Sequence, residues 1–203
     1  FVAGFTGDEI ERGGKRLGFC SDFIHVKRGM SRINVKLKSD QESEINGMGP
    51  EIQRKEVQQL FEKLDRMKSG DVLVLSGSIP ASISDRIYEE IMARLEGRGI
   101  RIVVDATKDL LVNVLKYKPF FVKPNNHELG EIYGVELKTR EDVVPYAKKM
   151  QQEGARNVLV SMAGEGAVLV AENGEVYKSK CPEGKGKNSV GAGDSMVAGF
   201  IAG

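Results

Sequence analysis

From residue 72 onward, short continuous apolar segments alternate with stretches in which apolar residues recur every three or four positions. The continuous segments are typical of strands buried on both faces, and the longer spacing is typical of amphipathic helices. This alternation indicates a mostly parallel sheet covered by helices on both faces, so we expect a three-layer α/β/α core. The expected strands are 72–75, 100–104, 120–122, 158–160 and 167–171.

The helices expected around these strands follow from the same periodicity. They cover 57–67, 83–95, 110–115 and 129–133. A further helix is expected after Thr139, because Thr139 followed by Asp142 has the spacing of a capping box.

The chain before residue 53 has a different pattern. Residues 32–38 alternate strictly between polar and apolar, which predicts a strand with one wet face, followed by a turn and a return strand. We therefore expect an antiparallel β flap over 23–47, attached to a core formed by 1–22 and 48–203. The opening residues 1–5 are apolar and resemble the middle of a strand.

Polar or glycine-rich residues follow four of the expected strands. They lie at 76–78, at Asp105, at 123–128 and at 161–166. In open parallel sheets, ligands bind beyond the carboxyl ends of the strands, which meet at one edge. Loops are often polar for other reasons, but four such ends favour one ligand-binding cleft.

The segment 188–195 combines closely spaced glycines with Asp194 and precedes the small, apolar residues 196–202. This pattern predicts a buried helix with a glycine-rich amino terminus. The free N–H groups and the positive end of the helix dipole suit a phosphate there. Asp194 is placed to accept a proton from a substrate hydroxyl, although a capping role for this carboxylate is the alternative.

Composition narrows the possible functions. The 203 residues carry 30 basic and 29 acidic side chains, so a net charge of +1 gives no reason to expect nucleic acid or an anionic membrane as a partner. Cys20 and Cys181 cannot form a disulfide framework and indicate reduced thiols in a cytoplasmic protein. No apolar run approaches the length of a membrane span. The sequence contains neither a Walker-type phosphate loop nor the dinucleotide-binding glycine fingerprint.

These segments together resemble the PfkB family of sugar kinases, which has the ribokinase fold. Gly191–Asp194 resembles the carboxyl-terminal signature of the family. Asn125 and Glu128 resemble its Asn-x-x-Glu motif, and Ser161–Gly166 resembles its nucleotide-binding turn. The flap resembles the β lid that closes over the sugar and often makes a dimer contact. Asn188 stands where most of the family carries Asp, which narrows the subgroup without choosing the sugar.

The resemblance implies a role for each candidate residue. Asp194 would be the catalytic base, and the anion hole would be formed by the backbone of Gly191, Ala192 and Gly193. ATP would be bound by Asn125, Ser161, Gly164, Gly166 and Gly193. Magnesium would be held, largely through water, by Glu128, Asn125 and Asp105. The sugar phosphate would be bound by Arg32, Lys36 and Ser78.

The residues alone leave simpler interpretations open. Arg32 and Lys36 also fit wet-face charges on a strand, and Ser78 fits a turn before a proline. Glu128 fits a solvated residue in the first turn of a helix, and Asp105 fits a turn at the end of a strand.

The resemblance implies ATP-dependent transfer of a phosphoryl group to the 6-hydroxyl of fructose 1-phosphate, in a homodimer formed through the β lid. Two alternatives remain open: a kinase for tagatose 6-phosphate or another sugar, and a non-catalytic module that binds nucleotide or sugar phosphate. The family also has a glycine-rich sugar-binding motif before the point where this chain starts, and helices after the point where it stops. We therefore expect the chain to be incomplete at both ends.

Overall fold

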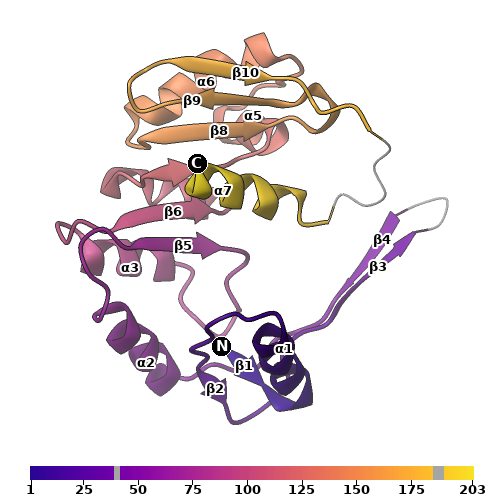
Figure 1. The fold of residues 1–203 in the computed structure, drawn as a ribbon, viewed down its shortest axis with the longest axis vertical. Helices are drawn as coiled ribbons and strands as arrows, with labels where there is room; N and C mark the ends of the chain where they lie inside the picture. The colour runs from indigo at the N-terminus through magenta and orange to yellow at the C-terminus, as the bar shows by residue number, and fades with distance from the viewer. Residues whose placement is uncertain (39–41, 185–189) are drawn as a thin grey trace. The chain divides into compact units, whose positions relative to one another are not determined.

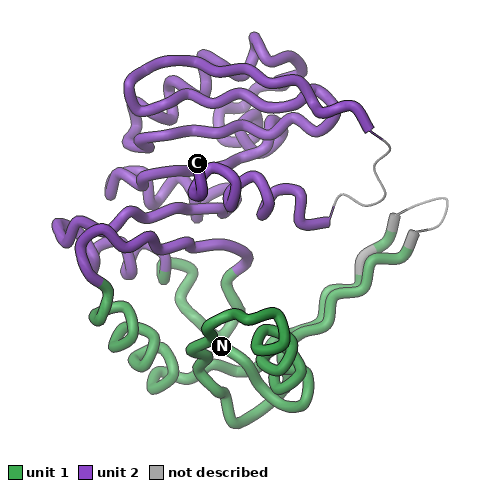
Figure 2. Tube along the Cα trace, in the orientation of Figure 1, with its two compact units in different colours: residues 1–67, 79–87 green, residues 68–78, 88–203 purple. Residues whose placement is uncertain are grey.

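The structure is a computed structural model that describes residues 1–38, 42–184 and 190–203. Asn188, the residue that narrows the possible subgroup within the resembled family, lies outside the described residues. The chain forms two compact units (Figure 2). The first unit contains residues 1–67 and 79–87, and the second contains 68–78 and 88–203.

A six-stranded sheet forms the centre of the second unit (Figure 1). Its strand order is β10-β9-β8-β7-β6-β5, and β5 to β8 are parallel neighbours. The strands are β5 (Val72–Ser76), β6 (Arg101–Asp105), β7 (Phe121–Val122), β8 (Asn157–Ser161), β9 (Ala167–Val170) and β10 (Val176–Ser179). The central strands carry fully buried residues such as Val103 and Val158, as expected for strands covered on both faces.

The edge of this sheet differs from the sequence expectation. The segment at 167–171 was expected to continue the parallel order, but β9 runs antiparallel to β8. The short connection through residues 162–166 is the reason, because a parallel crossover needs a dozen or more residues. A further antiparallel strand, β10, pairs with β9 and was not expected from the sequence.

Helices cover both faces of the sheet, with α7 in front of it and α3 and α6 behind it in Figure 1. They are α3 (Ile87–Leu95), α4 (Asp109–Val112), α5 (Asn126–Tyr133), α6 (Arg140–Gln152) and α7 (Ala192–Ala202), with short 3-10 turns η1 (Leu115–Tyr117) and η2 (Ala163–Glu165). The expected capping box at the start of α6 is confirmed by reciprocal bonds between Thr139 and Asp142.

Two helices depart from the sequence expectation. The expected helix over 83–95 begins only at Ile87, because Ile83 lies in a turn and packs in the core of the first unit. Helix α7 was expected to be buried on all sides, yet only its residue Val197 is buried. One face of α7 rests on the sheet, where Phe200 stacks on Phe121 at 4.0 Å, and most of its other described residues are exposed.

The first unit has a small core formed by Ala3, Val26 and Ile52. Its elements are β1 (Val2–Ala3), α1 (Gly4–Arg16), β2 (His25–Val26), β3 (Asn34–Lys38), β4 (Glu42–Asn46) and α2 (Arg54–Leu64). The expected strand over 1–5 is therefore limited to two residues, which pair with β2 in parallel. Helix α1 was not expected, since its sequence is largely polar and contains four glycines, which disfavour a helix interior.

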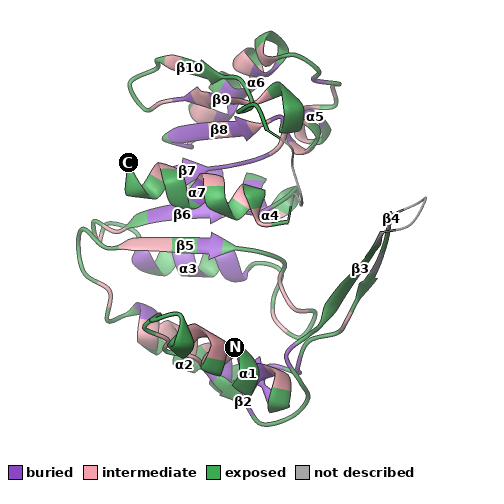
Figure 3. Cartoon of the chain, turned by 45° about the vertical axis from the view of Figure 1, so that its right-hand side comes forward, coloured by how far each residue is buried: buried purple, intermediate pink, exposed green. Residues whose placement is uncertain are grey.

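The expected flap is an antiparallel hairpin of β3 and β4, in which Val35 lies opposite Ile45. In the register of this hairpin, Val35 and Leu37 share one face with Ile45, and Ile33 lies one residue before β3. All four side chains are exposed, so the apolar face is not buried as the alternation suggested. Figure 3 shows the hairpin residues whose burial is described as exposed. Across the described parts of both units, no helix is long and apolar enough to span a membrane.

Candidate functional site

The candidate site lies at the carboxyl edge of the sheet in the second unit. The parallel register places Ser76 beside Asp105, and an isolated parallel bridge joins Asn125 to Ser161. The polar ends of β5, β6, β7 and β8 therefore follow one another along a single edge. This arrangement confirms that the four polar segments found in the sequence gather at one place.

A buried ion pair lies at the centre of this edge. Lys123 Nζ is 3.2 Å from Asp105 Oδ1, and the two side chains are only 8% and 20% exposed. Asp105 was expected to act on magnesium, whereas its carboxylate faces the Lys123 ammonium. The sequence analysis assigned no role to Lys123. The one feature that could have pointed to it is its position directly after a buried strand.

The amino terminus of α7 lies against the same lysine. A Cβ atom on Gly193 would lie 3.2 Å from Lys123 Nζ, so the absent side chain lets the ammonium approach the first turn. Gly191 precedes the helix with φ +78°, a conformation that favours glycine. Free N–H groups, the helix dipole and a buried ammonium therefore favour an anion at this point.

Asp194 projects from the same first turn of α7. Helix α7 has Gly191 as its N-cap and no side-chain capping bond, which argues against the alternative that Asp194 only caps the helix. Instead, Ser195 bonds back to the carbonyl oxygen of Gly191 through its N–H and its hydroxyl, both at 2.9 Å. Among the residues that the structure describes, Asp194 has no hydrogen-bond or ion-pair partner, so its carboxylate is available to a substrate.

A cavity of about 640 Å³ opens beside this turn. Four of the residues expected to bind ATP line it: Asn125, Ser161, Gly166 and Gly193. Gly164, the fifth, lies in η2 and is exposed. The cavity is also lined by residues without an assigned role, among them Asn126, His127, Lys180, Cys181 and Met196. Its size suits a nucleotide or another ligand of similar size.

Asn125 and Glu128 form the amino-terminal cap of α5. The Asn125 side-chain oxygen accepts from the Glu128 N–H, and Glu128 Oε2 accepts from the Asn125 N–H, each at 2.8 Å. Glu128 is thus a first-turn helix residue, and one of its carboxylate oxygens has no bond in this cap. The described residues include no group of three or more side chains that could hold a metal. This donor set fits a hydrated Mg²⁺ that takes its other ligands from phosphates and water.

The three residues expected to bind the sugar phosphate lie in different units. Ser78 follows β5 in the second unit and is exposed. Arg32 and Lys36 belong to the first unit, immediately before and within the hairpin, and both are exposed. Their roles in substrate binding stay predictions.

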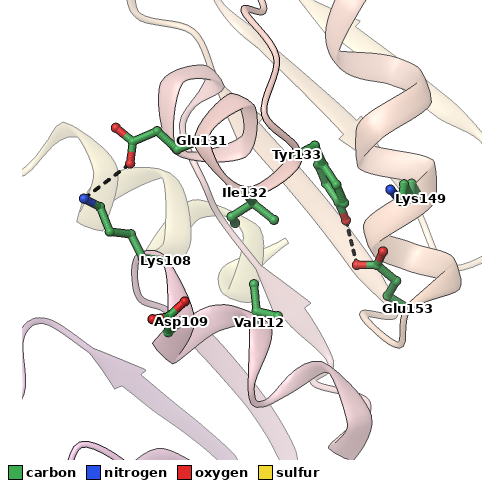
Figure 4. Close-up of a pocket in the computed structure, with 8 residues that line it drawn as sticks. All are labelled: Lys108, Asp109, Val112, Glu131, Ile132, Tyr133, Lys149 and Glu153. Carbon is green, nitrogen blue, oxygen red and sulfur yellow. Dashed lines mark hydrogen bonds and ion pairs between the residues drawn. The ribbon is translucent and has the colours of Figure 1, made fainter.

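A second cavity, of about 550 Å³, lies among α4, α5 and α6 and contains none of the expected site residues (Figure 4). Ile132 and Val112 point toward its centre, and Lys108 reaches Glu131 at 3.5 Å. The Tyr133 hydroxyl donates to Glu153 Oε2 at 2.7 Å. Burial, together with this bond, raises the pKa of Tyr133 above its ordinary value.

Comparisons with known proteins agree with this geometry. The model of the pfkB family carbohydrate kinases matches residues 1–203. The 1-phosphofructokinase of Bacillus subtilis is 45% identical over 203 residues, which are 100% of this chain and 66% of that protein. The D-tagatose-1-phosphate kinase of Bacillus licheniformis is 31% identical over 202 residues, with coverages of 99% and 66%. The chain thus spans just under two thirds of the length of these relatives.

Solved structures of sugar-phosphate kinases also match this chain. The crystal structure of phosphofructokinase-2 from Escherichia coli in complex with fructose-6-phosphate matches with a TM-score of 0.88 and 26% identity. The match covers 99% of this chain and 67% of that one. A tetrameric inhibited form of the same Escherichia coli enzyme matches with the same TM-score and 27% identity.

Proposed function

Since the chain belongs to the pfkB family of carbohydrate kinases, we propose that the protein transfers the γ-phosphate of ATP to the 6-hydroxyl of fructose 1-phosphate. The products are fructose 1,6-bisphosphate and ADP. The observation that carries this proposal is the Asp194 carboxylate, which has no described partner and lies in the same helical turn as Gly193, the glycine that approaches Lys123. A base and an anion site within one turn are what in-line phosphoryl transfer needs.

Asp194 is the catalytic base of this proposal. As the 6-hydroxyl oxygen bonds to the γ-phosphorus, its proton passes to the Asp194 carboxylate. The bond between the γ-phosphorus and the bridging oxygen breaks, and ADP leaves with that electron pair. Positioning and charge neutralisation supply most of the rate enhancement in such a transfer, since the protein performs little covalent chemistry.

The transferring phosphoryl group is stabilised by fixed positive charge. The N–H groups of Gly191, Ala192 and Gly193 donate to its oxygens at the positive end of the α7 dipole. The Lys123 ammonium is paired with Asp105 and lies close to Gly193. It neutralises negative charge on the phosphoryl group. A buried, preorganised cation acts more strongly than a solvated one, because little water screens it.

The nucleotide occupies the 640 Å³ cavity, where Asn125, Ser161 and Gly166 contact it. Gly164 contacts the nucleotide from the neighbouring η2 turn. Magnesium bound with ATP would neutralise part of the charge on the phosphates. Glu128, Asn125 and Asp105 would hold its water shell, with Glu128 contributing the carboxylate oxygen that is left out of the helix cap.

The acceptor is recognised by Arg32, Lys36 and Ser78. The planar guanidinium of Arg32 suits the phosphate of the sugar, and Lys36 adds a second positive charge.

The exposed apolar face of the hairpin, formed by Val35, Leu37 and Ile45, supports self-association as a homodimer through this lid. The exposed free thiols Cys20 and Cys181 support a cytoplasmic location.

An ADP-release assay over a panel of acceptors tests this function. We expect the highest kcat/KM with fructose 1-phosphate, ahead of tagatose 6-phosphate, fructose 6-phosphate and free fructose. A preference for a tagatose phosphate, either the 6-phosphate or the 1-phosphate in the name of the relative from Bacillus licheniformis, would favour the second candidate, so the panel includes both. Equal turnover of free fructose would refute recognition of the sugar's phosphate, and ATP binding without any turnover would indicate a non-catalytic module.

A further inference from the structure

The turn that follows β5 presents two unused hydrogen-bond donors. Gly77 has φ +87°, so the chain turns sharply after Ser76 and leaves the second unit after Ser78. Ser78 is exposed, and within the described residues neither its N–H nor its hydroxyl has a partner. Donors of this kind can bind a substrate only when the peptide that carries them is held in one orientation.

Tyr88 provides that orientation from the point where the chain re-enters the second unit. Its hydroxyl lies 2.9 Å from the carbonyl oxygen of Ser76 and 3.2 Å from that of Gly77, and donates to them. The residue is only 9% exposed, so its ring is fixed by packing. Burial and the nearby negative charge of Asp105 raise the pKa of Tyr88, in keeping with the role of its hydroxyl as a donor.

A third bond completes the arrangement. The N–H of Gly77 donates to the carbonyl oxygen of Asp105 at 3.3 Å, on the neighbouring strand. The peptide between Ser76 and Gly77 is therefore held at both its carbonyl and its N–H, and the next peptide is held at its carbonyl. Because a trans peptide directs its N–H opposite to its carbonyl, the N–H of Ser78 points away from the Tyr88 hydroxyl.

We propose that Tyr88 is a positioning residue for acceptor binding, which holds the turn after β5 so that the N–H and hydroxyl of Ser78 donate to the acceptor. This inference rests on the proposed function, because it takes Ser78 as part of the acceptor site. Tyr88 itself touches neither substrate nor ATP in this proposal. Its effect therefore passes entirely through the Ser76–Ser78 turn.

The test compares Tyr88→Phe with Tyr133→Phe in the intact protein. Both substitutions remove a hydroxyl that donates a hydrogen bond and has a raised pKa, but Tyr133 lines the cavity that holds no site residue. We expect Tyr88→Phe to raise the KM for the acceptor about five- to tenfold, the change expected from one ordered donor, with the KM for ATP altered less than about twofold. Tyr133→Phe should leave both constants unchanged.

A double variant separates positioning from simple loss of stability. If Tyr88 acts through Ser78, Tyr88→Phe adds little to the acceptor KM of Ser78→Ala, so the two effects are strongly non-additive. A lower melting temperature of Tyr88→Phe with an unchanged acceptor KM would overturn the inference, because a purely structural bond would act in that way. Fully additive effects on KM would overturn it as well.

The acceptor panel keeps the two proposals distinguishable. If the wild-type protein prefers an acceptor other than fructose 1-phosphate, the substrate assignment fails. The Tyr88 comparison is then made with the preferred acceptor, and a raised KM still supports the inference. If the wild-type protein transfers phosphate to no acceptor in the panel, both proposals are refuted.

Discussion

Replacing Lys123 by methionine removes the charge that faces Asp105 but keeps a flexible apolar side chain of similar length. Lys123 Nζ lies 3.2 Å from Asp105 Oδ1 in a pair that is mostly withdrawn from water. At this separation two unit charges attract each other by about 5 kcal/mol with an effective dielectric constant of about 20. The cost of desolvating both ions offsets much of that attraction.

The expected loss follows from the charge that is left behind. Removing one partner of a fully buried pair costs about 3–5 kcal/mol. Asp105 keeps 20% of its side chain exposed, so some water reaches the orphaned carboxylate. We therefore expect Lys123→Met to lower the free energy of unfolding by about 3 kcal/mol, the lower end of that range. Lys138→Met, which breaks a pair whose side chains are 71% and 76% exposed, should cost about 0.5 kcal/mol or less.

Urea unfolding of Lys123→Met, Asp105→Asn and the double variant measures this coupling. The double variant contains no orphaned charge, so it should be more stable than the sum of the single losses predicts, by about 2 kcal/mol. Its kcat should stay low, because the ammonium beneath Gly193 is absent. Single losses that add to within about 0.5 kcal/mol would refute the pair as a coupled unit. A double variant with wild-type kcat would refute the catalytic role of Lys123.

Three further predictions concern other parts of the second unit. A Cβ at Gly166 would lie 2.0 Å from the carbonyl oxygen of Ser179, so Gly166→Ala should lower the free energy of unfolding by more than about 2 kcal/mol. Gly174→Ala is the matched control, because Gly174 also has positive φ but its Cβ would meet no atom within 4 Å. Comparable losses in the two variants, measured by urea unfolding, would contradict the steric explanation. Asp142 has a pKa held below its ordinary value, first by the backbone N–H of Thr139, so its stabilising effect is present above the unfolded pKa near 4 and is lost as the pH falls through the lower folded value. The melting temperature of Asp142→Asn should therefore lie below that of the wild type at neutral pH and approach it in acid, and a constant difference would contradict the assigned bond. Cys181 lines the 640 Å³ cavity proposed to bind the nucleotide and Cys20 does not, so ATP should slow labelling of Cys181 by a maleimide and leave labelling of Cys20 unchanged. Equal rates with and without ATP would place the nucleotide elsewhere.

Local patterns predicted those parts of the fold whose cause is local. The capping box at Thr139 and Asp142 was predicted because its residues are three apart, and the parallel strands were predicted because burial on both faces leaves continuous apolar runs. Helix α1 was missed because its apolar residues are sparse and glycines interrupt it. Strand β9 was given the wrong direction because a short apolar run has the same composition in either orientation.

The sequence likewise predicted only some features of the candidate site. The place of Glu128 in the first turn of a helix and the glycine-rich start of α7 before Asp194 were predicted, whereas the reciprocal cap between Asn125 and Glu128 was not. The pairing of Lys123 with Asp105 could not be predicted, because only the register of β6 and β7 brings together two residues 18 positions apart. The bonds from Tyr88 to the turn after β5 likewise depend on where α3 packs.

The most direct test of the central claim is the kcat of Asp194→Asn in the ADP-release assay with the preferred acceptor. Asparagine keeps the size of the side chain and the first turn of α7 but cannot accept the hydroxyl proton. Because general-base catalysis contributes about 10²- to 10⁴-fold, we predict a fall in kcat of at least about 100-fold, with little change in the KM for ATP and in the melting temperature. A variant that retains the wild-type kcat would contradict Asp194 as the catalytic base, and with it the mechanism proposed for this site.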